Sequence, residues 1–145
     1  MKSTLRSVAP RLWVSDAESV ESVSPLMGVI IDCTGRAPTA SNKIHARPTG
    51  VTGHSWTVAD LDRVVEWATA YLDDGKRVLI HCNRGRSRST CAAAAVLLAQ
   101  GIVDTVPAAL ARTGIPGESP VATSVAGLRK WWEAKQEARQ ESMFG

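Results

Sequence analysis

One segment of this 145-residue chain decides its fold, Val78-Leu79-Ile80-His81-Cys82-Asn83-Arg84-Gly85-Arg86-Ser87-Arg88-Ser89-Thr90. Its first three residues are apolar, a run that is too short for a helix and typical of a buried strand. Polar residues around Gly85 follow, and the alanine-rich run from Cys91 to Gln100 is then a strong helix former that Gly101 ends. The segment therefore predicts a strand, a tight loop and a helix in that order. Ligands of α/β proteins bind where strands end and helices begin, so we expect the functional site at this loop.

The composition of the loop is that of an oxyanion site with a nucleophile. Its backbone N–H groups and the N-terminus of the following helix attract a negative group, and Arg88 adds a planar cation that binds two phosphate oxygens at once. Cys82 lies close to that helix end and to several arginines, which favours its thiolate form. These features indicate displacement at phosphorus through a phosphocysteine intermediate, with Ser89 donating a hydrogen bond to the departing sulfur. The alternative is a structural cysteine that precedes a basic patch.

His81-Cys82, five further residues and then Arg88-Ser89 resemble the signature of the cysteine-dependent protein tyrosine phosphatases. Gly85 and the run from Ser87 to Thr90 are most similar to the dual-specificity branch. The resemblance implies an α/β fold with a central, mostly parallel sheet of about four to five strands flanked by helices. It also implies that His81 tunes the loop and the thiolate through hydrogen bonds, and that no metal or cofactor takes part. The residues that it assigns to phosphate binding are Asn83, Arg84, Gly85, Arg86, Ser87 and Arg88.

Composition excludes several classes of protein. The net charge of +3 mildly favours anionic partners, but there is no lysine-rich run or base-stacking aromatic cluster, so we expect no nucleic acid partner. No apolar stretch approaches the length of a membrane span, and the N-terminus lacks the apolar core of a signal peptide. The three cysteines form no CxxC pair, which argues against a disulfide framework or a zinc site and favours a reducing cytoplasm.

The length predicts a single domain over 1–145, with the resemblance covering about residues 8–135 and a frayed tail over 136–145. The oligomeric state stays open.

Apolar patterns and caps predict the other elements. Short strands are expected at 12–14 and 27–32, with one or two helical turns between them. A helix with an apolar stripe begins after Thr57, which forms a capping box with Asp60, and ends at 73–75. Two more helices are expected, one with Asp104 as its N-cap and a last one that begins at Ser119-Pro120.

The stretch 34–59 contains no Asp or Glu but five basic side chains, Arg36, Lys43, His45, Arg47 and His54. In the family that the chain resembles, an aspartate on a loop in this region protonates the leaving oxygen, and the matching segment 47–54 has none. Three residues are candidates for that acid, namely His54, Glu118 and Asp60. Each has a structural alternative, such as a solvated loop histidine or the capping box of Asp60. The remaining possibility is that water or the substrate supplies the proton.

The two other cysteines have different expected places. Cys33 follows the strand at 27–32, and some relatives in the family carry a second cysteine there that forms a protective disulfide with the nucleophile. By that resemblance Cys33 is a candidate redox partner of Cys82, and the alternative is a small packing residue. Cys91 lies in the alanine-rich helix and is expected to pack in the core.

The resemblance implies a dual-specificity or tyrosine protein phosphatase, whose substrate is a phosphoprotein or another phosphomonoester. Arg84 and Arg86 add an electropositive mouth, which favours inositol phosphates or phosphoinositides as an alternative. Basic residues at these positions also resemble atypical plant and fungal phosphatases of inositol pyrophosphates. The missing aspartate leaves a third hypothesis, a phosphate-binding pseudophosphatase module. Cys82 and Ser89 argue against that hypothesis, because binding alone needs no thiol.

Overall fold

The structure is a computed structural model that describes residues 4–35 and 42–144. Five strands form one sheet, in the order β1-β2-β5-β3-β4. Their bounds are β1 Arg6–Ala9, β2 Leu12–Ser15, β3 Val29–Asp32, β4 Lys43–His45 and β5 Val78–His81. Only the pairing of β1 with β2 is antiparallel; the other three pairings are parallel. The predicted central, mostly parallel sheet is confirmed.

Strand β5 is the middle strand, and its four residues are all buried. Ile80 pairs in register with Val14 of β2 on one side and with Ile31 of β3 on the other. A continuous apolar run is typical of a parallel strand that is covered on both faces. The carboxyl ends of β2, β3 and β5 therefore lie side by side, and the segment after His81 leaves the sheet at that edge.

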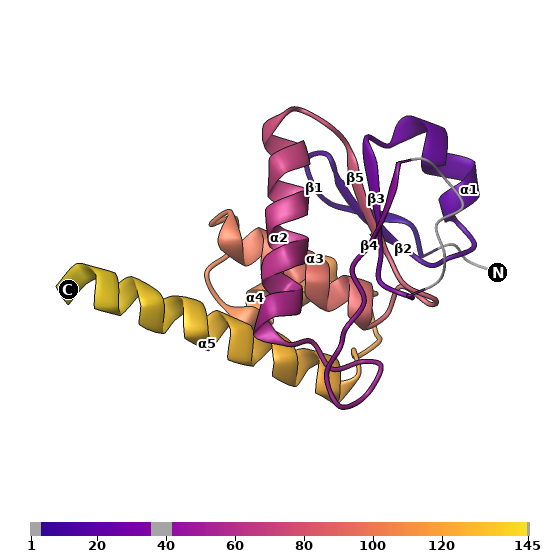
Figure 1. Cartoon of the computed structure of the whole chain (residues 1–145). Coiled ribbons are helices and arrows are strands. Elements are labelled where there is room, and N and C mark those ends of the chain that lie inside the picture. Colours follow the sequence, from indigo (N-terminus) through magenta and orange to yellow (C-terminus); the bar gives the residue numbers. More distant parts are fainter. Residues whose placement is uncertain (1–3, 36–41, 145) are drawn as a thin grey trace.

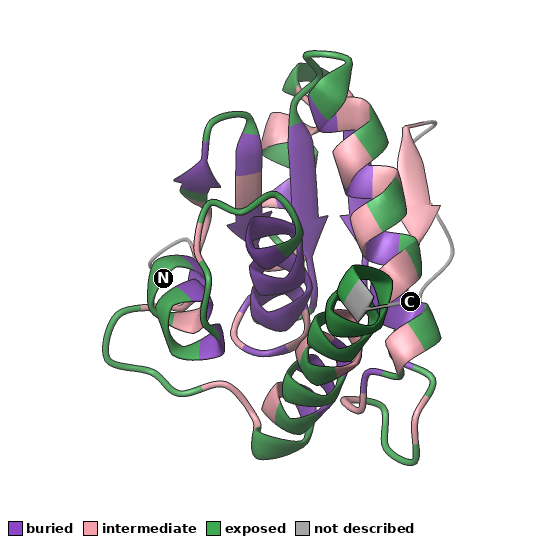
Figure 2. Ribbon diagram, turned by 90° about the vertical axis from the view of Figure 1, so that its left-hand side faces the viewer, coloured by how far each residue is buried: buried purple, intermediate pink, exposed green. Residues whose placement is uncertain are grey.

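Helices cover both faces of the sheet (Figure 1). One face carries α2 (Val58–Asp73), α3 (Arg88–Ala99), α4 (Val106–Thr113) and α5 (Ala122–Phe144). The other carries the short α1 (Val20–Val23) and the 3₁₀ turn η1 (Ser24–Leu26). The main core lies between the sheet and α2, α3 and α5, and a small second cluster of Val20, Ile30 and Leu79 lies under α1. Helix α3 is buried over 89–98, because its small alanine side chains let the sheet and the other helices approach closely (Figure 2).

The capping box at the start of α2 is confirmed. The backbone N–H of Asp60 donates to the Thr57 hydroxyl at 3.1 Å, and the Asp60 carboxylate accepts from the Thr57 backbone at 3.1 Å. The predicted N-cap of α4 is wrong by one residue, because Thr105 rather than Asp104 caps it and accepts from Ala108 N at 3.2 Å.

The two ends of α5 differ from the sequence-based prediction. The helix begins at Ala122, not at Ser119-Pro120, and the N–H of Val121, which has no acceptor within the helix, donates to Ser87 Oγ at 2.7 Å. The predicted frayed tail over 136–145 is instead helical as far as Phe144, in keeping with its many strong helix formers. Of the adjacent tryptophans, Trp131 is buried and Trp132 half-buried. Among the helices of the described ranges, none has both the length and the apolar character that crossing a bilayer requires.

Candidate active site

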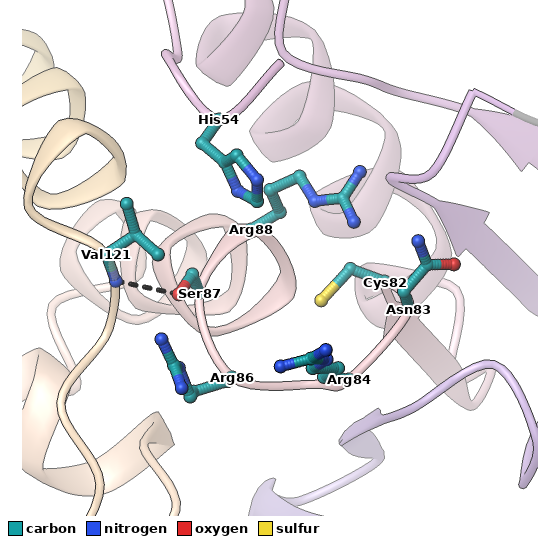
Figure 3. A pocket seen from close by; sticks show the side chains of 8 residues that line it. All are labelled: His54, Cys82, Asn83, Arg84, Arg86, Ser87, Arg88 and Val121. Carbon is teal, nitrogen blue, oxygen red and sulfur yellow. Dashed lines mark hydrogen bonds between the residues drawn. The ribbon is translucent and has the colours of Figure 1, made fainter. Parts of the chain in front are cut away.

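A cavity of about 330 Å³ opens at the carboxyl edge of the sheet, where β5 passes into α3. Figure 3 shows the side chains that surround it. The lining residues are His54, Cys82, Asn83, Arg84, Arg86, Ser87, Arg88 and Val121. Six of the eight belong to the segment 82–88, called here the phosphate loop. Four of the eight side chains are basic and none is a carboxylate.

Cys82 lies at the base of this cavity, where β5 ends. Its side chain is almost covered, with 3% of the residue exposed, and its sulfur lies 3.1 Å from Ser89 Oγ. Ser89 is fully buried in the first turn of α3, so its hydroxyl is held in place beside the sulfur. This is the contact that the sequence predicts for a serine that assists sulfur as a leaving group.

The backbone of the phosphate loop offers its N–H groups to the cavity. Within the described part of the chain, no N–H of residues 83–88 donates a hydrogen bond to a protein acceptor. Two carbonyls of the loop are held from outside, because Asn83 O accepts from Ala17 N at 3.1 Å and Gly85 O accepts from Arg6 at 2.8 Å. In a trans peptide the N–H points opposite to the carbonyl. The N–H groups of Arg84 and Arg86 are therefore directed away from these outside contacts, as an anion cradle requires.

Gly85 is the residue on which the loop turns. Its φ is +68°, in the left-handed region that side-chain-bearing residues rarely adopt. A Cβ at this position would lie 2.8 Å from both the carbonyl carbon of Ser15 and the hydroxyl of Thr4. Both the backbone conformation and the space therefore require glycine here.

Arg6, on β1, holds the loop from behind. Its guanidinium donates to Thr113 O at 2.7 and 2.9 Å, to Thr4 O at 2.7 Å, to Gly85 O at 2.8 Å and to the Thr90 hydroxyl at 3.0 Å. Thr90 also donates to Gly85 O at 3.2 Å. Arg6 thus ties the loop to the end of α4. Arg6 is not among the residues predicted from the sequence, because nothing near it along the chain marks it as part of a site.

Two further contacts fix the loop from other elements. The Arg88 guanidinium donates to Cys33 O, at the end of β3, at 3.3 Å, which holds it at the cavity in Figure 3. Ser87 accepts the hydrogen bond from Val121 already described, so the start of α5 is bound to the loop. Arg84 is exposed and Arg86 half-buried, so neither is committed to the core.

His81 points away from the cavity and is buried beside Asp32. Its Nε2 lies 3.7 Å from Asp32 Oδ1, and Lys43 Nζ lies 3.5 Å from the other carboxylate oxygen. Burial lowers the pKa of His81, although the Asp32 charge opposes the shift. Burial also disfavours the Asp32 carboxylate, but hydrogen bonds from Thr34 and the two nearby bases outweigh it and lower the pKa of Asp32. Neither ring nitrogen of His81 has a hydrogen-bond partner among the described residues, so the predicted tuning of the loop and the thiolate by His81 stays a prediction.

The three candidate acids occupy different places. His54 lines the cavity, whereas Asp60 and Glu118 do not. Asp60 is buried in the capping box and also accepts hydrogen bonds from Thr49 N and Oγ1 at 2.8–2.9 Å. Burial opposes its charge, but these bonds prevail and lower the pKa of Asp60, so it has no proton to donate at neutral pH. Glu118 is an exposed residue of the loop between α4 and α5.

Cys33 and Cys82 directly follow the neighbouring strands β3 and β5 at the carboxyl edge of the sheet. Cys33 N donates to His81 O at 2.9 Å, and Asp32 pairs in register with His81, so the two cysteines follow neighbouring strands at matching positions. Cys33 is fully buried, and this burial raises the pKa of its thiol well above the usual range. Burial likewise raises the pKa of Cys91, inside α3, to about 12. All three cysteines are free.

The other basic residues of the stretch 34–59 lie away from the cavity or outside the described residues. Arg36 falls in a segment outside the described ranges, and Arg47, His45 and Lys43 do not line the cavity. Over 4–35 and 42–144, no three His, Cys, Asp or Glu side chains gather as a set that could hold a metal ion.

Comparison with known proteins places the fold. No protein-family model and no curated protein matches the chain. Solved structures do match it. Human DUSP28 superimposes with a TM-score of 0.78 at 19% identity, over 94% of this chain and 97% of that one. Tk-PTP in its active form gives 0.76 at 19% identity, over 92% and 99%. PTPMT1 in complex with PI(5)P gives 0.75 at 16% identity, over 93% and 98%. The chain therefore has the fold of the dual-specificity branch of cysteine-dependent phosphatases, as its loop sequence predicts.

Proposed function

We propose that the protein is a phosphomonoester hydrolase in which Cys82 is the nucleophile. One observation carries the proposal. The sulfur of Cys82 lies 3.1 Å from Ser89 Oγ within a loop whose N–H groups at 83–88 have no acceptor in the described protein. An anion-binding module needs the N–H groups and Arg88, but it needs neither a thiol nor a hydroxyl beside that thiol.

The reaction runs in two displacements. The Cys82 thiolate attacks phosphorus, the S–P bond forms and the bond to the leaving oxygen breaks. Arg88 and the loop N–H groups hold the three remaining phosphoryl oxygens, where charge must be stabilised. Water then attacks the phosphocysteine, and the Ser89 hydroxyl donates a hydrogen bond to the sulfur as the S–P bond breaks. Because the loop supplies the positive field, we propose that neither a metal nor another cofactor is required.

Phosphoproteins are the proposed substrate class, with phosphotyrosine and phosphoserine or phosphothreonine both accepted. The likeness of the fold to DUSP28 and Tk-PTP supports this class. A reducing cytoplasm is the proposed location, in keeping with the three free cysteines.

A second substrate class has an observation of its own. The cavity is lined by His54, Arg84, Arg86 and Arg88 without any carboxylate, which favours a polyanion such as an inositol phosphate or a phosphoinositide. PTPMT1, which has the same fold, was solved in complex with PI(5)P. To decide between the classes, we would measure phosphate release from phosphopeptides and from soluble inositol phosphates. Both rates would be compared between the wild type and Arg84→Gln. A preference for phosphopeptides that is unaffected by Arg84→Gln would exclude the polyanion.

The experiment that tests the proposal is hydrolysis of para-nitrophenyl phosphate in the presence of EDTA, with Cys82→Ser measured alongside. This substrate has a good leaving group, so it depends least on a proton donor. We expect turnover by the wild type and none above background by the variant. A folded wild type without turnover would contradict the proposal and favour the phosphate-binding module.

A further inference from the structure

The proposed reaction leaves one chemical requirement unmet. A basic leaving oxygen needs a proton as its bond to phosphorus breaks, and a positioned acid contributes about 10²–10⁴-fold to the rate. Of the eight residues that line the cavity, only His54 has a side chain that ordinarily gains and loses a proton near neutral pH and is not itself the nucleophile.

The segment that carries His54 is held at both sides of that residue. Gly50 N donates to Ser55 O at 2.8 Å, which closes a tight turn around His54. The hydroxyl of Ser124, fully buried in α5, donates to His54 O at 2.7 Å. Thr49, before the turn, is bound by the buried Asp60 carboxylate. The backbone that carries the imidazole is thus held beside the cavity by one local turn bond and by contacts with α2 and α5, whereas a solvated loop histidine needs none.

The ring has one nitrogen available to a substrate. Nδ1 is buried and finds no hydrogen-bond partner among the residues that the structure describes. The other ring nitrogen, Nε2, is not among the buried atoms without a partner, so we assign proton exchange to it. In Figure 3 the ring lies beside Arg88, with Arg84 and Arg86 across the cavity.

The charges that face His54 come from the phosphate loop. Arg86 and Arg88 are cationic, Cys82 is the nucleophile, and Val121 and Ser124 on the α5 side carry no charge. Burial lowers the pKa of His54, and Arg88 and Arg86 lower it further. A bound phosphate dianion acts in the opposite direction, because a nearby negative charge favours the imidazolium. The substrate thus promotes protonation of the group that faces it.

We propose that His54 is the proton donor to the leaving oxygen, an inference that rests on the proposed phosphatase function. In the first displacement the imidazolium of His54 gives its proton to the oxygen that leaves, so the alcohol departs neutral and His54 becomes neutral. In the second, neutral His54 takes a proton from the attacking water as the S–P bond breaks. The thiolate, the imidazolium and hydrogen phosphate result, which returns the enzyme to its starting state.

The test is a leaving-group series of aryl phosphates, from para-nitrophenyl to phenyl to 4-methylphenyl phosphate, with His54→Gln and the wild type. We expect nearly equal rates with para-nitrophenyl phosphate, and a loss that grows toward about 10²-fold or more as the leaving group becomes more basic. In the wild type, kcat/KM for phenyl phosphate should fall as pH rises through the lowered pKa of His54, because the acid must be protonated. The variant should lack this fall. The matched control is Val51→Ala, a fully exposed residue of the same loop.

Each outcome decides a different question. A loss that is the same for every leaving group would overturn the inference and show that His54 binds phosphate instead. No loss with any substrate would overturn it as well. Turnover of para-nitrophenyl phosphate that depends on Cys82 shows that the proposed function stands independently, and its absence removes both. If a thermal melt shows that His54→Gln is unfolded, His54→Asn provides the same comparison.

Discussion

Two loops meet at the cavity, and they are built in different ways. The phosphate loop joins a buried strand to a buried helix and depends on Gly85 for its turn. The segment 46–57, which carries His54, joins the edge strand β4 to α2 and is held by side chains of distant elements, Ser124 of α5 among them. The first loop can be recognised from its local residue types, although Arg6 and Val121 also bind it from distant elements. The second loop has no comparable local pattern, and its place at the cavity depends on its contacts with other elements.

This difference separates binding of the reacting group from protonation of the leaving group. In the proposed reaction, phosphate binding rests on backbone N–H groups, whose positions follow from the path of the chain. Protonation rests on one side chain, whose position depends on how firmly its loop is anchored. Substitutions in the phosphate loop should therefore affect every substrate alike, while those around His54 should affect only substrates with basic leaving groups.

The largest difference between the two loops is expected when one glycine in each is replaced by alanine. Gly85→Ala adds a Cβ at φ +68° that meets Ser15 at 2.8 Å, so the cradle must deform. We expect kcat/KM to fall by about 10²-fold or more, as for a displacement of about 1 Å in a site. Gly53→Ala has open space around it, and we expect stability within about 0.5 kcal/mol of wild type and unchanged rates. Equal losses in the two variants, measured with para-nitrophenyl phosphate, would remove the distinction between the loops.

Arg6 should matter for the phosphate loop alone. Arg6→Ala leaves Gly85 O with only the Thr90 hydroxyl as a donor, and a hydrogen bond to a charged group is worth about 1.5–3 kcal/mol. If about 1.4 kcal/mol of this cost appears as lost alignment in the transition state, kcat/KM falls about tenfold. Free guanidinium at low concentration should restore part of the lost rate, which a purely structural role would not show.

Arg112→Ala is the control for Arg6, because Arg112 makes one hydrogen bond to a backbone carbonyl, Val8 O at 3.1 Å, away from the loop. We expect its kinetics to match the wild type. The assignment of Arg6 fails if both variants lose rate to the same extent, or if Arg6→Ala lowers only the thermal midpoint.

Ser124 tests the anchoring of the second loop. Ser124→Ala removes the donor to His54 O, a bond worth about 1 kcal/mol, so turnover of phenyl phosphate should fall about fivefold. Turnover of para-nitrophenyl phosphate should not change. Thr123→Ala, an exposed neighbour in the first turn of α5, supplies the baseline. A decrease that is equal for the two substrates would mean that Ser124 supports the whole site.

The smallest kinetic effect is expected for Cys33, which follows β3 and belongs to neither loop. Under reducing conditions Cys33→Ala should match the wild type. After treatment with peroxide, wild-type activity should return on reduction, because the sulfenic acid of Cys82 condenses with Cys33 and releases water. This protection should become faster as pH rises, since the pKa of Cys33 is raised and its thiolate forms only at high pH. Equal recovery of the two proteins would leave Cys33 as a packing residue.

The part of the site that the sequence predicts is the part that is close along the chain. Cys82 and Ser89 are seven residues apart, and the apolar strand and alanine-rich helix on either side fix their register. Arg6 is separated from Gly85 and Thr113 by 79 and 107 residues, so no local pattern could reveal it. The sequence offers His54 only as one of three candidate acids. The contact from Ser124 of α5 that holds its segment at the cavity cannot be seen in the sequence of the loop itself.

Errors in the fold have a similar origin. Asp104 and Thr105 are both good caps, and tertiary packing chooses between them. Ser119-Pro120 has the local pattern of a helix start, but α5 begins at Ala122. The residue before it, Val121, donates its N–H to Ser87. The charges of the segment after Lys135 suggested fraying, whereas its helix formers extend α5.

The way in which Arg6 and Val121 bind the phosphate loop has a consequence for biogenesis. The cradle is completed by the first strand, by the end of α4 and by the residue before α5. A nascent chain therefore cannot close it until nearly all the elements have left the ribosome, and contacts of such long sequence separation form slowly. The strand–loop–helix segment alone carries Cys82, the proposed nucleophile, yet it lacks its outer supports until the whole domain has assembled. Catalytic turnover is thus a direct readout of the native population, and folding intermediates should remain silent in an activity assay.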